Sequence, residues 1–560
     1  MKCRFIVFIL SLMSMFGYGY DRITGEKFAS RSEVLGQNGM IATSHPLATQ
    51  IGLDILKKGG TAIDAAIAAN IALGLMEPTG SGVGGDLFAI VWHGKENKLY
   101  GLNASGPSPK SINLNFFKEK KLDKIPSFGP LPVTVPGAVD GWVKLHQKFG
   151  NQDFKTLFEP TIYYAKNGFP ITETIAFYLE ASKGRYSNYP NFSEVWLKKG
   201  QTPKKGEIFK NPFLASTLEK IAEEGRAGFY EGEIAKTIVD FIQSQGGFLT
   251  YEDLSGFHSE WVSPVSTNYR GYDVWELPPN GQGIAALQIL NILENFDLKN
   301  LGLFSAEYIH LFVEAKKLAF ADRAKYYADP QFAEIPLKKL ISKSYAKNRA
   351  SLINLKEPAL TDEPGVLIDG DTIYLTAADK FGNMISLIQS NYRGMGSGMM
   401  PPGLGFMLQD RGELFSLQKD HLNVVEGGKR PFHTIIPAFI TKDGKPYVSF
   451  GVMGGATQPQ AHAQIVVNMI DFGLNLQEAG DAPRIVHSGS SQPTDEIMNS
   501  GGTLSIETGF GLDIVRTLEN MGHELKYQKG IFGGYQAIML KQGVYYGASE
   551  SRKDGQASGF

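Results

Sequence analysis

The segment GDTIYLT, residues 370–376, places Thr372 at the first residue of a predicted strand, directly behind a loop. That loop, residues 357–371, is acidic and rich in Pro and Gly, which is typical of an exposed and cleavable connector. Two β-prone stretches follow, 372–378 and 384–390, and the five turn-forming residues between them predict a β-hairpin with Thr372 at its open end. A Thr hydroxyl becomes nucleophilic when a base takes its proton, and the α-amine of a Thr freed by chain cleavage can be that base. From the hairpin alone, an ordinary strand-initiating threonine is the commoner case.

The overall charge excludes several classes of function. The 560 residues include 55 basic and 57 acidic side chains, giving a formal net charge of −2 with no long run of one sign. This balance argues against a nucleic-acid partner or a polybasic membrane surface. The ten histidines show no metal-ligand spacing, so we expect no metal site.

The first 19 residues predict a signal peptide, because a basic start is followed by an apolar run at 5–16 and by small residues. The alternative is a buried N-terminal strand or helix. The apolar run is too short to span a bilayer, so we expect a periplasmic or secreted protein without a stable membrane anchor. Cys3 is the only cysteine and lies inside this segment. A mature chain without it has no cysteine nucleophile, disulfide or thiolate metal ligand.

A buried helix and a glycine-rich segment come early in the chain. Residues 62–76 are apolar on nearly every side and follow Thr61 as N-cap, which predicts a helix buried between other layers. The glycines of 78–86 suggest a dinucleotide site, but a helix precedes them and the predicted strand 87–92 follows, the reverse of that motif. Close backbone packing near a catalytic centre is the better interpretation, since glycine permits an approach that other residues resist.

The middle of the chain, residues 140–355, is predicted to be mainly helical, with 305–327 as its longest periodic segment. We expect Glu314, Asp322 and Arg323 in that segment to form a buried or interface ion network rather than a catalytic pair.

A second chemical feature is the predicted strand 447–453, which runs into Gly454 and Gly455 and then into a helix beginning near 456 or 457. Free backbone N–H groups point outward at such a junction. Two such donors stabilise the oxyanion of an acyl-transfer reaction, each by on the order of 3 kcal/mol. A simple strand-to-helix turn is the alternative, so the glycine pair indicates an oxyanion site only if it lies beside a nucleophile.

Several dispersed motifs together resemble the gamma-glutamyltransferase (glutathione hydrolase) family, in the right order over nearly the whole mature chain. These motifs are Asp371-Thr372, the turn 379–383, the segment 80–85, Val135-Pro136-Gly137, Arg430-Pro431 and Gly454-Gly455.

The resemblance implies an α+β fold, the four-layer αββα sandwich of the N-terminal nucleophile hydrolases, as one globular body. It also implies cleavage between Asp371 and Thr372 into a large subunit, 20–371, and an associated small catalytic subunit, 372–560. Thr372 would then be the nucleophile and Gly454 and Gly455 the oxyanion site. Ser390 stands where the family has a second threonine that supports the amine of the nucleophile. No cofactor is implied.

The implied substrate pocket departs from the best-known family members. Ser105 falls where they have an arginine for the substrate α-carboxylate. Leu414, with Glu413 beside it, falls where they have an aspartate for the α-ammonium. Because both charges are missing from their usual places, γ-glutamyl specificity is in doubt.

Further pocket positions also differ. Arg411 stands where the family has a pocket glutamine, and His433 and Thr434 stand where it has paired serines. The family's asparagine is displaced by one position to Asn391, leaving Tyr392 in its place, and a one-residue shift in a strand reverses the facing side. Arg393, Arg411 and His433 are candidates for a carboxylate clamp from other directions.

Three functions remain open from the sequence. The leading one is a γ-glutamyl hydrolase and transferase that cleaves glutathione-like compounds through an acyl-enzyme on Thr372, with water or an amine as acceptor. A related amidase or acylase that removes dicarboxylic, glutaryl-type acyl groups is favoured by the altered pocket. An uncleaved periplasmic binding protein is disfavoured, because Thr372, Ser390 and the glycine pair have no obvious purpose in simple binding.

Overall fold

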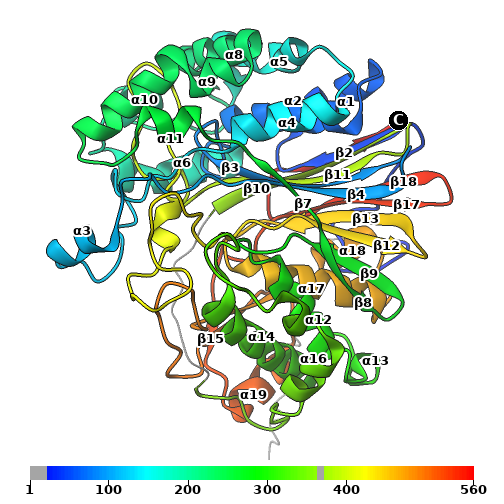
Figure 1. Cartoon of the computed structure of the whole chain (residues 1–560). Helices are drawn as coiled ribbons and strands as arrows, with labels where there is room; N and C mark the ends of the chain where they lie inside the picture. Colours follow the sequence, from blue (N-terminus) through cyan, green and yellow to red (C-terminus); the bar gives the residue numbers. More distant parts are fainter. Residues whose placement is uncertain (1–21, 362–370) are drawn as a thin grey trace, which may run out of the picture.

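The computed structural model describes residues 22–361 and 371–560, which form four layers in the order helices, sheet, sheet, helices (Figure 1). The predicted signal peptide, 1–19, lies outside the described residues, as does most of the loop before Thr372. The predicted αββα sandwich is confirmed. None of the helices in the described ranges is long and apolar enough to cross a membrane.

The first sheet contains both strands of the predicted hairpin at its centre. Its strands, in order across the sheet, are β19 (Gln556–Gly559), β2 (Gly39–Thr43), β10 (Asp371–Asp379), β11 (Met384–Tyr392), β3 (Asp86–His93), β4 (Lys98–Ala104) and β7 (Glu260–Val262).

The second sheet packs face to face on the first. Its order is β1 (Val34–Gly36), β18 (Val544–Ser549), β17 (Tyr535–Lys541), β13 (Lys445–Val452), β12 (Ala438–Lys442), β9 (Tyr272–Glu276) and β8 (Val265–Tyr269). Apolar side chains from both sheets fill the space between them, and this burial holds the two sheets together. They include Met40, Phe88, Tyr374, Phe439 and Ile538.

One helical layer covers the outer face of the first sheet (Figure 1). It contains α1 (Pro46–Lys57), α2 (Ala62–Met76), α4 (Ala138–Phe149), α5 (Glu159–Asn167), α6 (Glu173–Tyr186), α8 (Pro212–Glu224) and α10 (Gly232–Ser244).

The other helical layer covers the second sheet and contains α12 (Gly283–Leu293), α14 (Ala306–Tyr326), α16 (Lys343–Ala350), α17 (Thr457–Ile470) and α18 (Leu476–Asp481). Beyond it lie α19 (Leu512–Met521) and a small sheet of β14 (Ile485–Ser488), β15 (Thr503–Ile506) and β16 (Leu525–Tyr527).

The predicted hairpin is confirmed, with each strand slightly longer than expected. β10 and β11 are antiparallel and hydrogen-bonded, and both are interior strands because β2 and β3 flank them. Strands buried on both faces read as continuous apolar runs, which explains why this hairpin shows little alternation. The nucleophile candidate is therefore held by a rigid element and not by a loop.

The predicted buried helix is confirmed as α2. Thr61 and Asp64 form a complete capping box at its start, and every residue of the helix except Gly74 is buried. It packs on β10 and β11 from outside the sheet, with α1, α4 and α5 on its other sides. A helix without a polar face requires this enclosure.

The longest predicted helix is confirmed as α14, and the expected ion pairing is confirmed for Glu314 and Asp322 but not for Arg323. Glu314 pairs with Lys317 at 2.8 Å, and Asp322 pairs with Arg349 at 3.2 Å. Arg323 instead donates to amide side chains on other elements. The three side chains point in different directions around the helix, so each finds its own partner.

Candidate active site

Thr372 lies at the start of β10 with its hydroxyl directed at β11. The Thr372 Oγ1 donates a hydrogen bond to the Ser390 Oγ over 3.2 Å. The Ser390 Oγ also accepts from the Tyr392 N–H at 2.8 Å. All three residues are buried. The fold therefore brings the predicted nucleophile and its predicted supporting hydroxyl into direct contact.

The β10–β11 ladder is irregular at the position of Thr372. The pairing shifts between Asp371 and Ile373, so that Thr372 lies opposite two residues, Ser390 and Asn391. A β-bulge of this kind re-aims side chains locally, and bulges are common next to active sites.

The bulge determines where the side chains of Asn391 and Tyr392 lie. Tyr392 adopts a positive φ of 77° and lines a cavity of about 40 Å³. Asn391 is directed instead at the glycine segment, because a Cβ on Gly82 or Gly85 would meet its amide. Tyr392 therefore occupies the cavity position, and the displaced asparagine packs against backbone.

The predicted close packing of the segment 80–85 is confirmed. A Cβ on Gly80 would lie 3.0 Å from the Thr372 carbonyl oxygen, and one on Gly85 would lie 2.7 Å from the Ser390 carbonyl oxygen. Contacts below about 3.0 Å are essentially unknown for a real Cβ, so a side chain at Gly85 would displace β11.

Gly454 and Gly455 form the junction between β13 and α17. Their φ angles are 116° and 53°, and their carbonyl groups accept from the N–H groups of Thr457 and Gln458. Within the described part of the chain, neither glycine N–H donates a hydrogen bond. The Gln282 amide holds the pair in place by donating to the Gly455 carbonyl at 2.9 Å. Both N–H groups are thus available as oxyanion donors.

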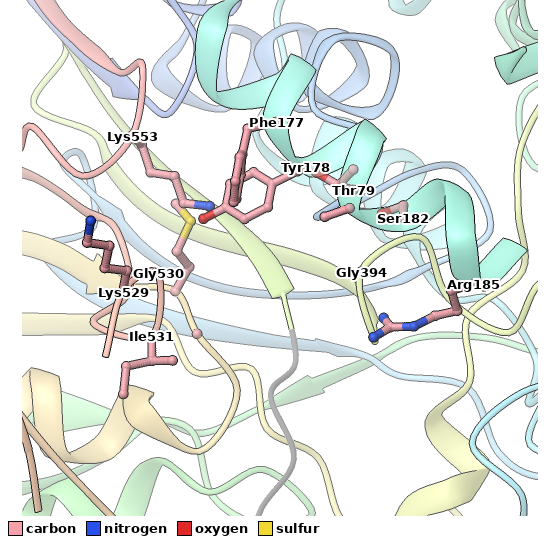
Figure 2. Close-up of a pocket in the computed structure, with 14 residues that line it drawn as sticks. Thr79, Phe177, Tyr178, Ser182, Arg185, Gly394, Lys529, Gly530, Ile531 and Lys553 are labelled. Carbon is pink, nitrogen blue, oxygen red and sulfur yellow. The ribbon is translucent and has the colours of Figure 1, made fainter. Parts of the chain in front are cut away.

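A cavity of about 340 Å³ lies beside Gly454. Figure 2 shows the side chains around it. We call it the α6 pocket, because Phe177, Tyr178 and Arg185 of α6 form one wall. The loop 529–533 between β16 and β17 forms the facing wall. Thr79, the neighbour of Gly80, also lines it, which places the pocket near Thr372.

Arg411 is a buried cation next to the predicted acyl site. Its Nη1 donates to the Thr434 Oγ1 at 2.6 Å, and its guanidinium lies 4.8 Å from the centre of the Tyr392 ring. Among the described residues, its Nε and Nη2 have no hydrogen-bond partner. Burial lowers the pKa of Arg411 to about 10, which still leaves it charged at neutral pH.

His433 does not serve as a cation, contrary to the carboxylate-clamp interpretation. It is fully buried, and its Nε2 lies 3.0 Å from the Asp86 Oδ2. Burial, with a smaller effect from Arg411, lowers the His433 pKa well below its usual value, so the imidazole is neutral at pH 7. The contact with Asp86 is therefore a hydrogen bond and not an ion pair. The general prediction that His433 binds substrate stays a prediction.

Asp86 is a buried acid that the sequence indicated only as the end of a glycine segment. Its Oδ1 accepts from the Gly106 and Gly137 N–H groups at 3.2 and 3.1 Å. Burial raises its pKa to about 7, an effect that Arg411 partly offsets. The sequence feature that could have identified Asp86 as a site residue is an acidic side chain directly after clustered glycines.

Glu413 is already engaged by a cation. Its carboxylate forms a bidentate ion pair with Arg393 and accepts from the Ser127 hydroxyl at 2.7 Å. Leu414 beside it is buried, and both line the same cavity of about 40 Å³ as Tyr392.

Ser105 lies in a buried amide network. Its Oγ donates to the Asn103 Oδ1 at 2.7 Å and accepts from the Asn280 amide at 3.2 Å. The Arg430 Nε reaches its carbonyl oxygen at 3.0 Å. A cation therefore does approach this position, from a distant part of the chain. The substrate-binding role of Ser105 stays a prediction.

The four-layer fold and the hydroxyl pair at the start of a central strand define the class of the protein as an N-terminal nucleophile hydrolase. The model of the gamma-glutamyltranspeptidase family matches residues 48–560. The chain belongs to this family.

Three relatives illustrate the range of the family. The chain is 37% identical to a glutathione hydrolase-like YwrD proenzyme of Bacillus subtilis (strain 168), over 94% of this chain and 99% of that protein. It is 33% identical to a glutathione hydrolase proenzyme of Escherichia coli (strain K12), over 93% and 91%. It is also similar to the crystal structure of a cephalosporin acylase from Bacillus halodurans, with 43% identity, a TM-score of 0.89 and coverage of 97% and 99%. These relatives are thus named for glutathione and for cephalosporin as substrates.

Proposed function

We propose that this chain is a self-cleaving amide hydrolase whose nucleophile is Thr372. In maturation, the Thr372 hydroxyl attacks the carbonyl carbon of the bond that joins it to Asp371. The peptide C–N bond breaks as the C–O bond forms, and water then releases the resulting ester. This sequence frees the Thr372 α-amine. The contact between the Thr372 and Ser390 hydroxyls supports this proposal most directly.

The freed α-amine is the general base of the catalytic cycle. Its unperturbed pKa of about 7.7–8.0 suits proton transfer near neutral pH. The Thr372 Oγ1 attacks the substrate amide, and the N–H groups of Gly454 and Gly455 stabilise the oxyanion. The amine product leaves, and water or an amine resolves the ester on Thr372.

The surroundings of Leu414 favour a dicarboxylic, glutaryl-type acyl group over γ-glutamyl. The paired Glu413 carboxylate already has Arg393 as its cation. The neighbouring Asp410 is buried, and burial raises its pKa to about 8, so this carboxyl is largely neutral at pH 7. The family's carboxylate is thus missing at Leu414 itself, although Asp123, Asp495 and Glu496 also line the cavity of about 40 Å³.

Arg411 is the proposed anchor for the distal carboxylate of that acyl group. Its Nε and Nη2 atoms, which have no hydrogen-bond partner among the described residues, offer a charge-assisted site next to the Tyr392 ring. γ-Glutamyl compounds remain the second candidate, because two of the relatives reported above are described as glutathione hydrolase or glutathione hydrolase-like.

The acyl preference is tested with glutaryl and γ-glutamyl p-nitroanilides. We expect kcat/KM to be at least about tenfold higher for the glutaryl compound, since Leu414 offers the ammonium of γ-glutamyl no carboxylate. Arg411→Gln should lower the glutaryl value by about 100-fold, the effect of losing charge-assisted hydrogen bonds worth about 2–3 kcal/mol.

Autoprocessing serves as the control for the Arg411→Gln variant, because a chain that still splits before Thr372 has a folded site. A strong preference for the γ-glutamyl anilide would reject the dicarboxylic assignment. Unchanged glutaryl turnover in a processed variant would reject Arg411 as the anchor.

Ser390→Ala should lower kcat/KM for the same anilide by about tenfold, because one neutral hydrogen bond to the nucleophile is worth roughly 0.5–1.5 kcal/mol. Ser390→Thr retains the hydroxyl and should recover most of the activity. The matched control is Ser386→Ala on the same strand, whose buried hydroxyl contacts Tyr374 at 2.8 Å, away from Thr372. If both alanine variants lose activity equally, Ser390 acts only through stability.

A further inference from the structure

Asp86 lies opposite Ser390 on the neighbouring strand of the first sheet. It is the first residue of β3, and the register of β3 and β11 pairs it with Ser390, which in turn contacts Thr372. Its side chain is fully buried, and the Gly106 and Gly137 N–H groups hold its Oδ1. The fold therefore fixes an acid one strand away from the hydroxyl pair, although the proposed acyl-transfer steps do not use it.

Asp86 and Arg411 are opposite charges without direct contact. Burial raises the pKa of Asp86 and lowers that of Arg411, and each of the two groups is the strongest neighbour opposing that effect on the other. The described hydrogen-bond and ion-pair partners of the Asp86 carboxyl are the two glycine N–H groups and the His433 Nε2. The Arg411 Nε and Nη2 have no hydrogen-bond partner among the described residues. Asp86 thus balances the charge of Arg411 and leaves these N–H groups available to a second anion.

The other charged or titratable groups around Asp86 are paired or neutral. Arg430, a weaker influence than Arg411, forms an ion pair with Glu260 at 3.1 Å. His433 is a neutral imidazole, because burial lowers its pKa well below the usual value. Tyr230 is a neutral phenol, because burial raises its pKa. Arg411 is therefore the cation whose charge Asp86 balances.

The groups around Arg411 leave Asp86 as the acid that titrates near neutral pH. Burial raises the pKa of Tyr392, so its phenol is neutral, and Glu413 is held in an ion pair by Arg393. Burial raises the pKa of Asp410 to about 8, compared with about 7 for Asp86. Among the described acids near Arg411, Asp86 therefore changes its charge first as the pH rises through neutrality.

We propose that Asp86 determines acyl specificity by acting as the counter-charge of Arg411 that the distal carboxylate of the substrate replaces. This inference rests on the proposed function, in which Arg411 anchors that carboxylate. When the carboxylate binds, two acids share one buried cation, and they are not both ionised there. The Arg411 N–H groups hold the substrate carboxylate, so Asp86 takes up one proton from solvent and no covalent bond changes.

The sign of the pH effect follows from this exchange. Below its pKa, Asp86 is already protonated in the free enzyme, so a dicarboxylic acyl group binds without proton uptake. Above its pKa, binding requires a proton, so it weakens as the pH rises. An acyl group without the distal carboxylate leaves Asp86 and Arg411 as they are, and its binding should not depend on the charge of Asp86.

The test compares glutaryl and butyryl p-nitroanilides, which differ in the distal carboxylate. The Thr372 α-amine acts in both reactions, so its titration cancels in the ratio of the two kcat/KM values. We expect the glutaryl-to-butyryl ratio to fall about fourfold from about pH 6 to about pH 7.5, as a carboxyl with a pKa of about 7 predicts. In Asp86→Asn the ratio should stay constant over this range.

Two further variants serve as controls for Asp86→Asn. Asp379 is also a buried acid whose pKa burial raises and whose oxygens accept from backbone N–H groups, but it lies at the far end of β10. Asp379→Asn should keep the wild-type fall in the ratio. Arg411→Gln should remove the fall, because the two acids then share no cation. A flat ratio in the wild type, or an equal fall in Asp86→Asn, would overturn the inference.

A binding measurement separates failure of this inference from failure of the proposed function. Calorimetry of glutarate binding at about pH 7.5, in two buffers with different ionisation enthalpies, counts the protons taken up. Asp86→Asn should take up about 0.7 fewer protons per bound glutarate than the wild type, the fraction of Asp86 ionised at that pH. Cleavage of neither anilide would reject Thr372 catalysis, and the proton count would still decide the role of Asp86. Equal counts in the two proteins would reject that role.

Discussion

Replacing Thr372 with alanine should leave the protein as one unbroken chain with no measurable amidase activity. The variant removes the hydroxyl that attacks the bond after Asp371, so no α-amine is freed, and both the nucleophile and its base are lost. We expect activity on an acyl anilide to fall by at least about 10⁴-fold, into the background, as for other catalytic nucleophiles. Intact-mass measurement and an anilide assay check both results.

Thr376→Ala is the matched control for this variant, because Thr376 is a buried threonine on the same strand. Its Oγ1 contacts the Ser449 Oγ at 2.8 Å, in the space between the sheets. The control should still be processed into two chains, the smaller beginning at Thr372. If Thr372→Ala splits at the same bond, self-cleavage by Thr372 is wrong. A wild-type protein that stays as one chain would favour the binding-protein alternative.

Replacing Gly454 with alanine should lower kcat/KM on the order of 100-fold, the typical effect of losing one oxyanion donor. The φ of 116° at Gly454 is a conformation that L-residues rarely adopt. A Cβ there also lies 3.3 Å from the Gly533 Cα. Alanine therefore relaxes by rotating the backbone, which turns the N–H away from the oxyanion.

Gly444→Ala separates this effect from backbone strain alone. Gly444 has a positive φ of 71° in the turn between β12 and β13, and a Cβ there meets nothing within 4 Å. Both variants should lose on the order of 1–3 kcal/mol of folding stability through strain, measured by urea unfolding. Only Gly454→Ala should lose activity. Equal kcat/KM in the two variants would remove the glycine pair from the mechanism.

The elements around the nucleophile were predictable because their signals are local. The turn 379–383 between two β-prone runs fixes the hairpin, and the change from strand to helix at Gly454-Gly455 marks the junction. The all-apolar sequence of 62–76 required burial on every side, and α2 has it. In each case hydrogen bonding or periodicity within about 20 residues carries the information.

The substrate pocket was less predictable because its contacts join distant segments. From the sequence, His433 is a candidate cation, but burial, with a smaller effect from Arg411, lowers its pKa and makes it neutral. From the sequence, Glu413 is a carboxylate without an assigned partner, but in the structure it forms an ion pair with Arg393. The α6 pocket left no sequence signal, since its walls come from a helix and a loop more than 300 residues apart.

The sequence by itself determined the nucleophile candidate, the hairpin that carries Thr372 and the family to which the chain belongs. The charges around the candidate pocket could be assigned only from the tertiary structure. Arg430 reaches the carbonyl of Ser105 across 325 positions of the chain, and the bulge at Thr372 turns Tyr392 to the cavity in place of Asn391. The physical reason is that backbone hydrogen bonding and periodicity are set by neighbours in sequence. The charge and direction of a buried side chain depend on whatever group the fold places against it.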